Sequence, residues 1–543
     1  MNPTITPAET IVHDTIRLPR AASPEAVGVP SAAIRAFVET LEAAHFSYHS
    51  FLVMKGGKVA AECYRFPFAN DTPHILYSVS KSVTSCAVGI AIEEGYFDLD
   101  TAVADVFPEF VPEKDYERFT RITVRHLLSM TAGKQTSVLT DKTRGEWIRR
   151  YAECGWYAEP GRKFNYINEN IFMLCAIIHR MTGQSVSEFL TPRMWEPLGI
   201  RTPYWETDEN GTESGGWGLF LTPESFAKFA LMLSQKGMFG GRQIVPRAYL
   251  EQATLPQAET DDKSPTGRPY YGYCFWLYDE NEYLCVGMYG QTAYIRKDSD
   301  LCVVVQSGVA ASAEPMYDAI RALADRVLHP TGSEVPEDLT EFLGSRPMDV
   351  LPQATLRSPL EETLQNKVIR FRKPVVTNLL GFPPSVLPAP AVYMTKDRAG
   401  NTDRFQFDFR ADHAVFQWRE GDEVCCVRLG LDGAYRRSRV TLAGTRYTIC
   451  GAANWQDENT LQIWLRPLES FCIRYLTLHF DGKKVTVSAD SDPRLAEILA
   501  DVGFMIRQMF RTKKGKELGI KAFDSLNTVA QPTLHGVLLN KKY

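Results

Sequence analysis

The sequence lacks the patterns that would assign the protein to a membrane, a nucleic acid or a metal ion. None of its apolar runs is long enough to span a bilayer, and the N-terminus has neither the basic start nor the apolar core of a secretory signal. The formal net charge is only −5, so we expect no broad attraction to nucleic acid. The 10 histidines include no His-x-His or His-Glu-x-x-His spacing, so a metal site has no support.

The number and placement of the cysteines indicate the redox environment of the protein. The 11 cysteines are odd in number, mostly scattered, and include no Cys-x-x-Cys pair. Several lie in apolar runs, such as Cys175 and Cys302. This usage is typical of reduced, buried thiols in a cytosolic protein. We therefore expect a cytoplasmic protein without a cofactor, a metal, a membrane or a nucleic-acid partner.

The first part of the chain predicts an α+β domain over residues 20–330. A hairpin is predicted around Gly56-Gly57, and residues 78–255 read mostly as helices and loops. Further strands are predicted at 283–289, 292–297 and 301–308, followed by a helix at 314–328. We therefore expect an antiparallel sheet built from both ends of the segment and flanked by helices, with a helical subdomain between.

The rest of the chain changes in character. Prolines are frequent over 331–368, which we interpret as a linker that partly packs on its neighbours. From 369 the apolar period becomes two, as in Phe405, Phe407 and Phe409, which predicts a smaller antiparallel all-β domain over 369–510 with a terminal helix at 494–510. Residues 511–543 are predicted to be a tail. The β domain could cover a cleft or mediate assembly, so homo-oligomerisation stays open.

Ser78 and Lys81 form a Ser-x-x-Lys motif where an amphipathic helix is expected to begin. Residues three apart share one face of a helix, and a lysine held beside a serine can accept its proton. Free N–H groups and the positive dipole end at a helix start disfavour a protonated lysine and can hold an oxyanion. The apolar stripe behind the motif comprises Val79, Val83, Cys86, Ala87, Ile90 and Ala91.

The motif alone is not specific, because it occurs again at Ser225 and Lys228. There Thr222 is predicted to be the N-cap and Pro223 the first helical residue. Ser225 would then be an ordinary first-turn residue and Lys228 a solvated one. On local evidence, a helix-start serine beside a surface lysine explains Ser78 about as well as a nucleophile does.

Two further segments are candidates. Tyr166 and Asn168 precede a very apolar helix, where a tyrosine could relay a proton and an asparagine could orient a substrate amide or the lysine; a simple helix cap by Asn168 is the alternative. Gly290 and Gln291 lie where one predicted strand ends and the next begins. Glycine there can mark close approach of a ligand, and the Gln291 N–H could donate to an oxyanion; a plain hairpin glycine is the alternative.

Taken in order, these motifs resemble the serine β-lactamase and penicillin-binding-protein superfamily, specifically its class C and esterase branch. The segment Ile122–Gly133, which contains His126-Leu-Leu-Ser, is similar to a stretch of that family, and so are Glu159-Pro-Gly161 and Gly215-Gly-Trp-Gly. The resemblance covers about residues 20–330 and implies a β-lactamase-like fold.

The resemblance also implies a role for each candidate. Ser78 would be the acylated nucleophile, Lys81 its base, and Tyr166 a partner of Lys81 in proton transfer. Asn168 would contact the substrate, and the backbone N–H groups of Ser78 and Gln291, the latter beside Gly290, would form the oxyanion hole. No cofactor is implied.

One departure bears on the substrate. The family's third motif usually carries lysine or histidine where this chain has Met288. A missing cation weakens recognition of a substrate carboxylate, so esterases and amidases are the branch it resembles most. We expect a serine hydrolase of a small ester or amide. A β-lactamase or D-alanyl carboxypeptidase activity is one alternative, and a catalytically silent binding or assembly protein is another.

Overall fold

The structure is a computed structural model, and the residues that it describes divide into two compact units, 14–346 and 347–539. It describes residues 14–135, 146–201, 203–208, 210–260, 266–310, 312–330, 336–349, 351–352, 356–372, 386, 402–420, 423–442, 445–494, 497 and 533–539. We call the two parts the N-terminal unit and the C-terminal unit and describe each by itself.

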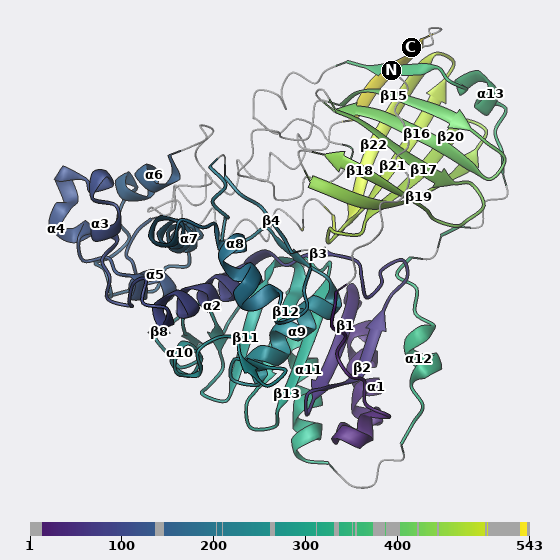
Figure 1. Cartoon of the computed structure of the whole chain (residues 1–543). Helices are drawn as coiled ribbons and strands as arrows, with labels where there is room; N and C mark the ends of the chain where they lie inside the picture. The colour runs from purple at the N-terminus through teal and green to yellow at the C-terminus, as the bar shows by residue number, and fades with distance from the viewer. Residues whose placement is uncertain are drawn as a thin grey trace. The chain divides into compact units, whose positions relative to one another are not determined.

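An eight-stranded sheet forms the centre of the N-terminal unit (Figure 1). Its strand order is β2-β1-β13-β12-β11-β10-β9-β8, and each neighbouring pair runs antiparallel. Strands from the two ends of the unit meet because β1 pairs with β13. The bounds are β1 Tyr48–Lys55, β2 Lys58–Tyr64, β8 Ala258–Glu259, β9 Tyr270–Tyr271, β10 Trp276–Leu277, β11 Glu282–Gly287, β12 Gln291–Arg296 and β13 Leu301–Ser307.

Helices cover this sheet because its central strands, such as β1 and β13, are buried on both faces. Helices α1 (Ser31–Ala43) and α11 (Glu314–Leu328) share one apolar core with alternate residues of β1 and β13. Helix α9 (Pro223–Ser234) packs on β1, β12 and β13 with side chains outside that core, which indicates the opposite face. Complete burial of such strands is the main source of stability for the sheet.

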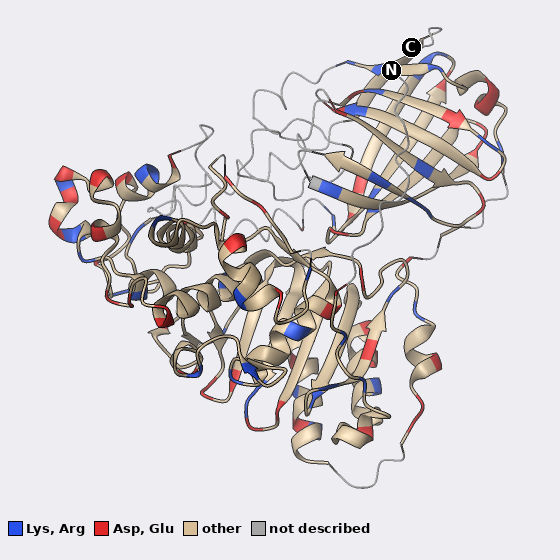
Figure 2. Ribbon diagram, viewed as in Figure 1, with Lys and Arg blue, Asp and Glu red and all other residues tan. Residues whose placement is uncertain are grey.

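The segment between β2 and α9 is mostly helical, and it includes a small sheet of order β3-β5-β4. Its strands are β3 His74–Ile75, β4 Tyr204–Trp205 and β5 Leu219–Leu221. Its helices are α2 Ser80–Glu93, α3 Val103–Val106, α4 Tyr116–Phe119, α5 Val124–Leu128, α6 Trp147–Glu153, α7 Glu169–Thr182 and α8 Val186–Leu190, and α10 Arg247–Ala253 follows α9. Figure 2 shows acidic and basic residues interspersed over α3, α4 and α6.

The C-terminal unit is a closed β-barrel of ten strands, a closure that the sequence did not predict. The strand order is β17-β16-β15-β14-β23-β22-β21-β20-β19-β18, and the barrel is closed by a pairing of β17 with β19, the neighbour of the last strand in this order. The bounds are β14 Val368–Phe371, β15 Thr402–Phe409, β16 His413–Glu420, β17 Glu423–Gly430, β18 Arg436–Leu442, β19 Thr445–Asp457, β20 Thr460–Pro467, β21 Ile473–Asp481, β22 Lys484–Asp492 and β23 Leu534–Leu539.

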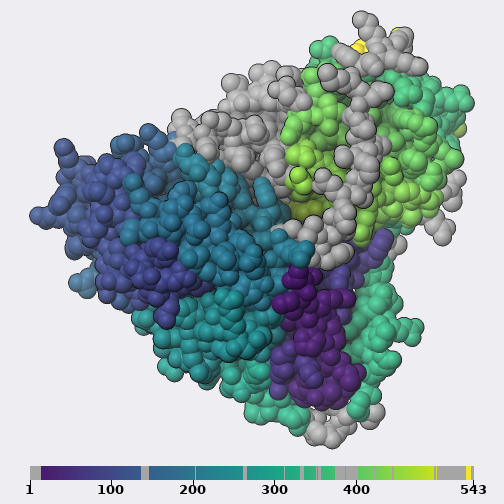
Figure 3. All heavy atoms as spheres, viewed as in Figure 1, coloured from purple at the N-terminus to yellow at the C-terminus, as the bar shows by residue number. Residues whose placement is uncertain are grey.

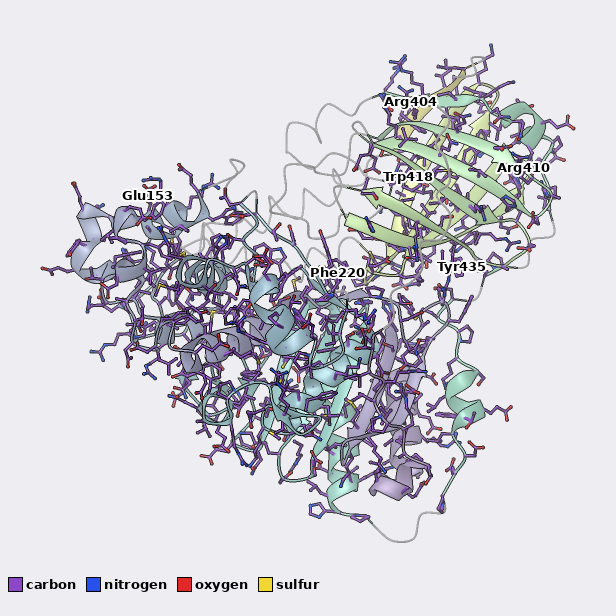
Figure 4. The ribbon with its side chains drawn as sticks, in the orientation of Figure 1. Glu153, Phe220, Arg404, Arg410, Trp418 and Tyr435 are labelled. Atoms are coloured by element: carbon purple, nitrogen blue, oxygen red, sulfur yellow. The ribbon has the colours of Figure 1, made fainter. Side chains whose placement is uncertain are left out.

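Two glycines allow the barrel to close. A Cβ atom on Gly430 would collide with the carbonyl oxygen of Ala434, and one on Gly451 would collide with that of Arg428. Inward-facing residues fill the interior, among them Trp418, labelled in Figure 4, which is 1% exposed. The barrel is therefore a packed core of its own.

The predicted domain limits and the structure differ at several places. Helix α12 (Thr340–Gly344) lies in the predicted linker and packs on β2, and α13 (Leu360–Leu364) packs on β15. In Figure 3 the purple start of the described chain lies beside the green segment that holds α12. Strand β23 lies in the predicted tail, and almost all of the helix predicted at 494–510 lies outside the described residues. No helix in the described ranges is long and apolar enough to cross a membrane.

Candidate active site

Ser78 lies in a single 3-10 turn, Tyr77–Val79, that leads into helix α2. The turn is held by its neighbours: Leu76 N–H donates to the Leu219 carbonyl at 2.8 Å, and Ser80 Oγ donates to the Tyr77 carbonyl at 2.6 Å. Ser78 itself is half-buried. Its hydroxyl is therefore accessible on a turn whose backbone is fixed at both ends, and it lies where the first N–H groups of a helical segment have no intrahelical acceptor.

Lys81 points back to Ser78 from the first turn of α2. Its Nζ lies 2.9 Å from Ser78 Oγ, 2.7 Å from Asn168 Oδ1 and 2.6 Å from the carbonyl oxygen of Gly216. A neutral amine can donate two protons, one to Asn168 and one to Gly216, and then has its lone pair left for Ser78. The geometry thus suits an amine that removes the serine proton.

Burial controls the charge of Lys81. The side chain is 1% exposed, and this burial lowers the pKa of Lys81 to about 7, against a smaller raising effect of charges that include Glu169. Removing an ammonium group from water disfavours its charged form. A substantial fraction of Lys81 is therefore the neutral base at neutral pH.

Tyr166 completes the group around Ser78. The Tyr166 ring lies over Lys81 Nζ at 4.8 Å from the ring centroid, and its side chain hydrogen-bonds Ser78. Burial raises the pKa of Tyr166, and the hydrogen bond to Ser78 lowers it by less. The phenol consequently keeps its proton at neutral pH.

Asn168 stands at the N-cap position of α7 but makes no side-chain cap hydrogen bond. Its amide oxygen accepts from Lys81 instead. The capping alternative from the sequence is therefore wrong for this side chain, whose oxygen is directed at Lys81 rather than at the first N–H groups of α7. Asn168 fixes one proton of Lys81 and so orients the amine.

A glycine-rich loop presents the third acceptor of Lys81. Gly215 has φ +64, and a Cβ atom there would collide with Cys175 Sγ, while one on Gly216 would come within 3.0 Å of Asn168 Oδ1. Thr84 Oγ1 of α2 also donates to the Gly215 carbonyl at 3.1 Å. The loop can approach the start of α7 this closely because neither glycine carries a side chain. The sequence analysis did not predict that Gly216 contacts Lys81, because every residue has a backbone carbonyl and the sequence does not show which one will act as an acceptor. The glycine-rich run Gly215-Gly-Trp-Gly was the only feature that pointed to this loop.

Gly290 and Gln291 lie at the tip of the hairpin formed by β11 and β12. A Cβ atom on Gly290 would meet Ser307 Oγ, and the Gln291 side chain donates to the Ser307 carbonyl at 2.6 Å. Gln291 pairs with Gly287 at the end of the β11–β12 ladder. Within the described contacts, neither residue has a side-chain bond to Ser78, Lys81 or Tyr166. The hairpin tip approaches the Ser78 turn through Gly287, because a Cβ atom there would collide with the Leu76 carbonyl oxygen.

Gly287→Ala is expected to destabilise the protein and to lower its activity together. The added methyl group meets a backbone oxygen that cannot rotate away, and overpacking of this kind costs about 1–3 kcal/mol. Thermal unfolding and ester hydrolysis measure the two effects. Gly344→Ala is the control, because nothing lies within 4 Å of a Cβ atom there. A Gly287→Ala protein as stable and as active as the Gly344→Ala protein would contradict this close packing.

The second Ser-x-x-Lys motif has a structural role. Ser225 N–H donates to Thr222 Oγ1, as predicted for an N-cap, but Lys228 is not solvated: its side chain is 0% exposed and its Nζ lies 2.8 Å from Asp14 Oδ2. Ser225 Oγ also donates to Asp14 Oδ2, at 2.7 Å. The prediction of a surface lysine was wrong because its partner is more than 200 positions away in the sequence. The carboxylate neutralises Lys228, whereas the acceptors of Lys81 are uncharged oxygens.

Comparisons with known proteins follow the same part of the chain. The family model described as Beta-lactamase matches residues 32–327. The chain is 27% identical over 282 residues to a 6-aminohexanoate-dimer hydrolase of Paenarthrobacter ureafaciens, covering 47% of this chain and 71% of the relative. It is 32% identical over 321 residues to Penicillin-binding protein 4 of Amycolatopsis lactamdurans, covering 51% and 82%. Among solved structures, a penicillin-binding protein homolog from Caulobacter crescentus has a TM-score of 0.47 at 17% identity, covering 55% of this chain and 98% of the other.

Proposed function

Because the chain belongs to the Beta-lactamase family, we propose that it is a serine hydrolase that cleaves a small ester or amide through an acyl-enzyme on Ser78. The observation that carries the proposal is the buried amine of Lys81, which lies 2.9 Å from Ser78 Oγ and has its pKa lowered to about 7 by burial. Relatives named as hydrolases support the reaction class.

In the acylation step, Ser78 Oγ forms a bond to the substrate carbonyl carbon while its proton passes to Lys81. The tetrahedral oxyanion is held by the Ser78 N–H and by the hairpin tip at residues 287–291. The bond to the leaving oxygen or nitrogen then breaks as that atom takes a proton through Tyr166 from Lys81. A positioned base contributes typically about 10²–10⁴ in rate, and one oxyanion donor about 10²–10³.

In the deacylation step, water attacks the acyl carbonyl, and its proton passes to the Lys81 and Tyr166 pair. The Ser78 ester bond breaks, and Ser78 Oγ regains a proton. No oxidant, metal or cofactor is needed for the balance of either step. If deacylation is the slower step, an activated ester gives an initial product burst.

The substrate is proposed to be uncharged near the reacting carbonyl. Met288 stands where the family's third motif usually has a cation. The name of one relative, 6-aminohexanoate-dimer hydrolase, indicates that this relative acts on a small molecule. A β-lactamase or D-alanyl carboxypeptidase activity is the second candidate, favoured by the 32% identity to a penicillin-binding protein. A silent binding protein would have no need to retain Ser78, Lys81 and Tyr166 together.

The test combines labelling with a substrate panel. A fluorophosphonate is expected to add to the Ser78 peptide, located by mass spectrometry, and a p-nitrophenyl ester is expected to turn over faster than a chromogenic cephalosporin. Preference for the cephalosporin would select the second candidate. Absence of any adduct and of any turnover in the panel would support the silent protein instead.

A further inference from the structure

Two tyrosines with unusual backbones lie on either side of the Ser78 turn. Tyr77, directly before Ser78, has φ +47, and Tyr289, in the tip of the β11–β12 hairpin, has φ +61. Bulky residues rarely adopt this left-handed conformation. Such residues cost free energy and persist only where their surroundings hold them, most often at functional sites.

The two side chains contact each other. Their ring centroids lie 5.1 Å apart at an interplanar angle of 71°, an edge-to-face pair. Tyr77 is 4% exposed and Tyr289 is 5% exposed. The pair joins two segments more than 200 residues apart in the chain, one carrying the serine and the other ending strand β11.

The backbone of each tyrosine is also held by hydrogen bonds. The Tyr289 carbonyl accepts from Ser307 Oγ at 2.7 Å, Val309 N at 3.1 Å and Gln291 Nε2 at 3.3 Å. The Tyr77 carbonyl accepts from Ser80 Oγ at 2.6 Å. Because both backbones are held, the ring pair transmits the position of the hairpin tip to the turn that carries Ser78.

We propose that Tyr77 and Tyr289 are positioning residues that set the spacing between the Ser78 N–H and the hairpin tip. The proposal rests on the hydrolase function above, in which these two segments hold the oxyanion. Lys81 is held by hydrogen bonds with Ser78, Asn168 and Gly216, and its amine lies over the ring of Tyr166. Loss of the ring pair should therefore weaken transition-state stabilisation and leave the base unchanged.

The experiment compares Tyr289→Phe, Tyr289→Leu and Tyr289→Gly. The phenylalanine variant keeps the ring and is expected to retain kcat within about threefold. The other two are expected to lose about 10- to 100-fold in kcat, which is less than the loss caused by removing one oxyanion donor completely. KM and the pH midpoint of the rate should stay unchanged. The glycine variant relieves the backbone cost, so a role of backbone strain alone predicts that it stays active.

Two further variants keep the inference open to refutation if Tyr289→Leu folds poorly. Tyr77→Leu removes the other ring, and the double leucine variant should lose little more than either single one, because paired residues are not additive. Lys236→Gly, at another left-handed residue with φ +56, is the control and should leave kcat unchanged. Rates are expressed per folded protein, taken from the circular dichroism signal.

Wild-type kcat in the leucine variants, or full activity in Tyr289→Gly, would show that the ring pair does not position the site. Equal losses in the phenylalanine and leucine variants would also contradict the proposal, because they would assign the effect to the hydroxyl group. Failure of the hydrolase function itself is distinguishable, because the wild-type protein would then acquire no fluorophosphonate on Ser78.

Discussion

Ser78→Ala is expected to lower kcat/KM for an activated ester by about 10⁴-fold or more and to abolish fluorophosphonate labelling. Removing the nucleophile of an acyl-enzyme mechanism leaves only binding and oxyanion stabilisation, which give far smaller accelerations. The fold should be unaffected, since Ser78 is half-buried on a turn held by Leu76 and Ser80. Steady-state hydrolysis and gel fluorescence measure the two losses.

The chain contains its own control for this experiment. Ser225→Ala changes the serine of the second Ser-x-x-Lys motif and removes the hydrogen bond from Ser225 Oγ to Asp14. Activity should stay at the wild-type level, with a loss of stability of about 1 kcal/mol. If labelling persists in Ser78→Ala and disappears in Ser225→Ala, the assignment of the nucleophile is wrong.

Lys81→Met is expected to reduce kcat by about 10³- to 10⁴-fold and to remove the pH dependence that the amine imposes. In the wild-type protein Lys81 must be neutral to act, and its pKa is about 7. The rate should therefore fall about tenfold per pH unit below that value and reach a plateau above it. Initial rates from pH 5 to pH 9 measure the profile.

Burial of Lys81 also has a consequence for stability. The pKa of Lys81 in the folded protein lies below the ordinary lysine value of 10.5, so the unfolded chain binds more protons between about pH 7 and pH 10.5. Stability contributed by this group therefore rises with pH across that window. Lys81→Met should flatten this part of the stability profile, as followed by denaturant unfolding.

Lys228→Met is the matched control for the lysine. It leaves the Asp14 carboxylate, 11% exposed, without its ion-pair partner, and breaking a buried pair in this way costs about 3–5 kcal/mol. Folded Lys228→Met protein should keep the wild-type kcat.

A pH midpoint that stays near 7 in Lys81→Met would show that another group titrates and would exclude Lys81 as the base.

Local patterns in the sequence predicted that Ser78 and Lys81 lie close together. A serine and a lysine three residues apart must share a helical face, and the structure places Lys81 Nζ 2.9 Å from Ser78 Oγ. The two Ser-x-x-Lys motifs nevertheless look alike locally. What separates them is the partner that the fold supplies, which is Asp14 for Lys228 and the uncharged oxygens of Asn168 and Gly216 for Lys81.

For the fold, too, local patterns predicted single elements but not the contacts between distant segments. Alternating Phe405, Phe407 and Phe409 predicted a strand, since a period of two is a property of a few adjacent residues. Closure of the barrel was not predicted, because it depends on the contact of β17 with β19 and on the pairing of β14 with β23 from the predicted tail. Gly430 and Gly451 permit that closure, but a glycine in a strand does not name the backbone it will meet.

By itself the sequence determined many of the helical and extended segments and the Ser-x-x-Lys spacing, because these follow from residues close together in the chain. The order of its motifs also indicated the Beta-lactamase family. Only the tertiary structure decided the charge of Lys81, the acceptor at Gly216 and the contact between Tyr77 and Tyr289. Each of these depends on burial or on a partner roughly 90 to 200 residues away. A pKa is set by everything that surrounds a group, and those surroundings exist only once the chain has folded.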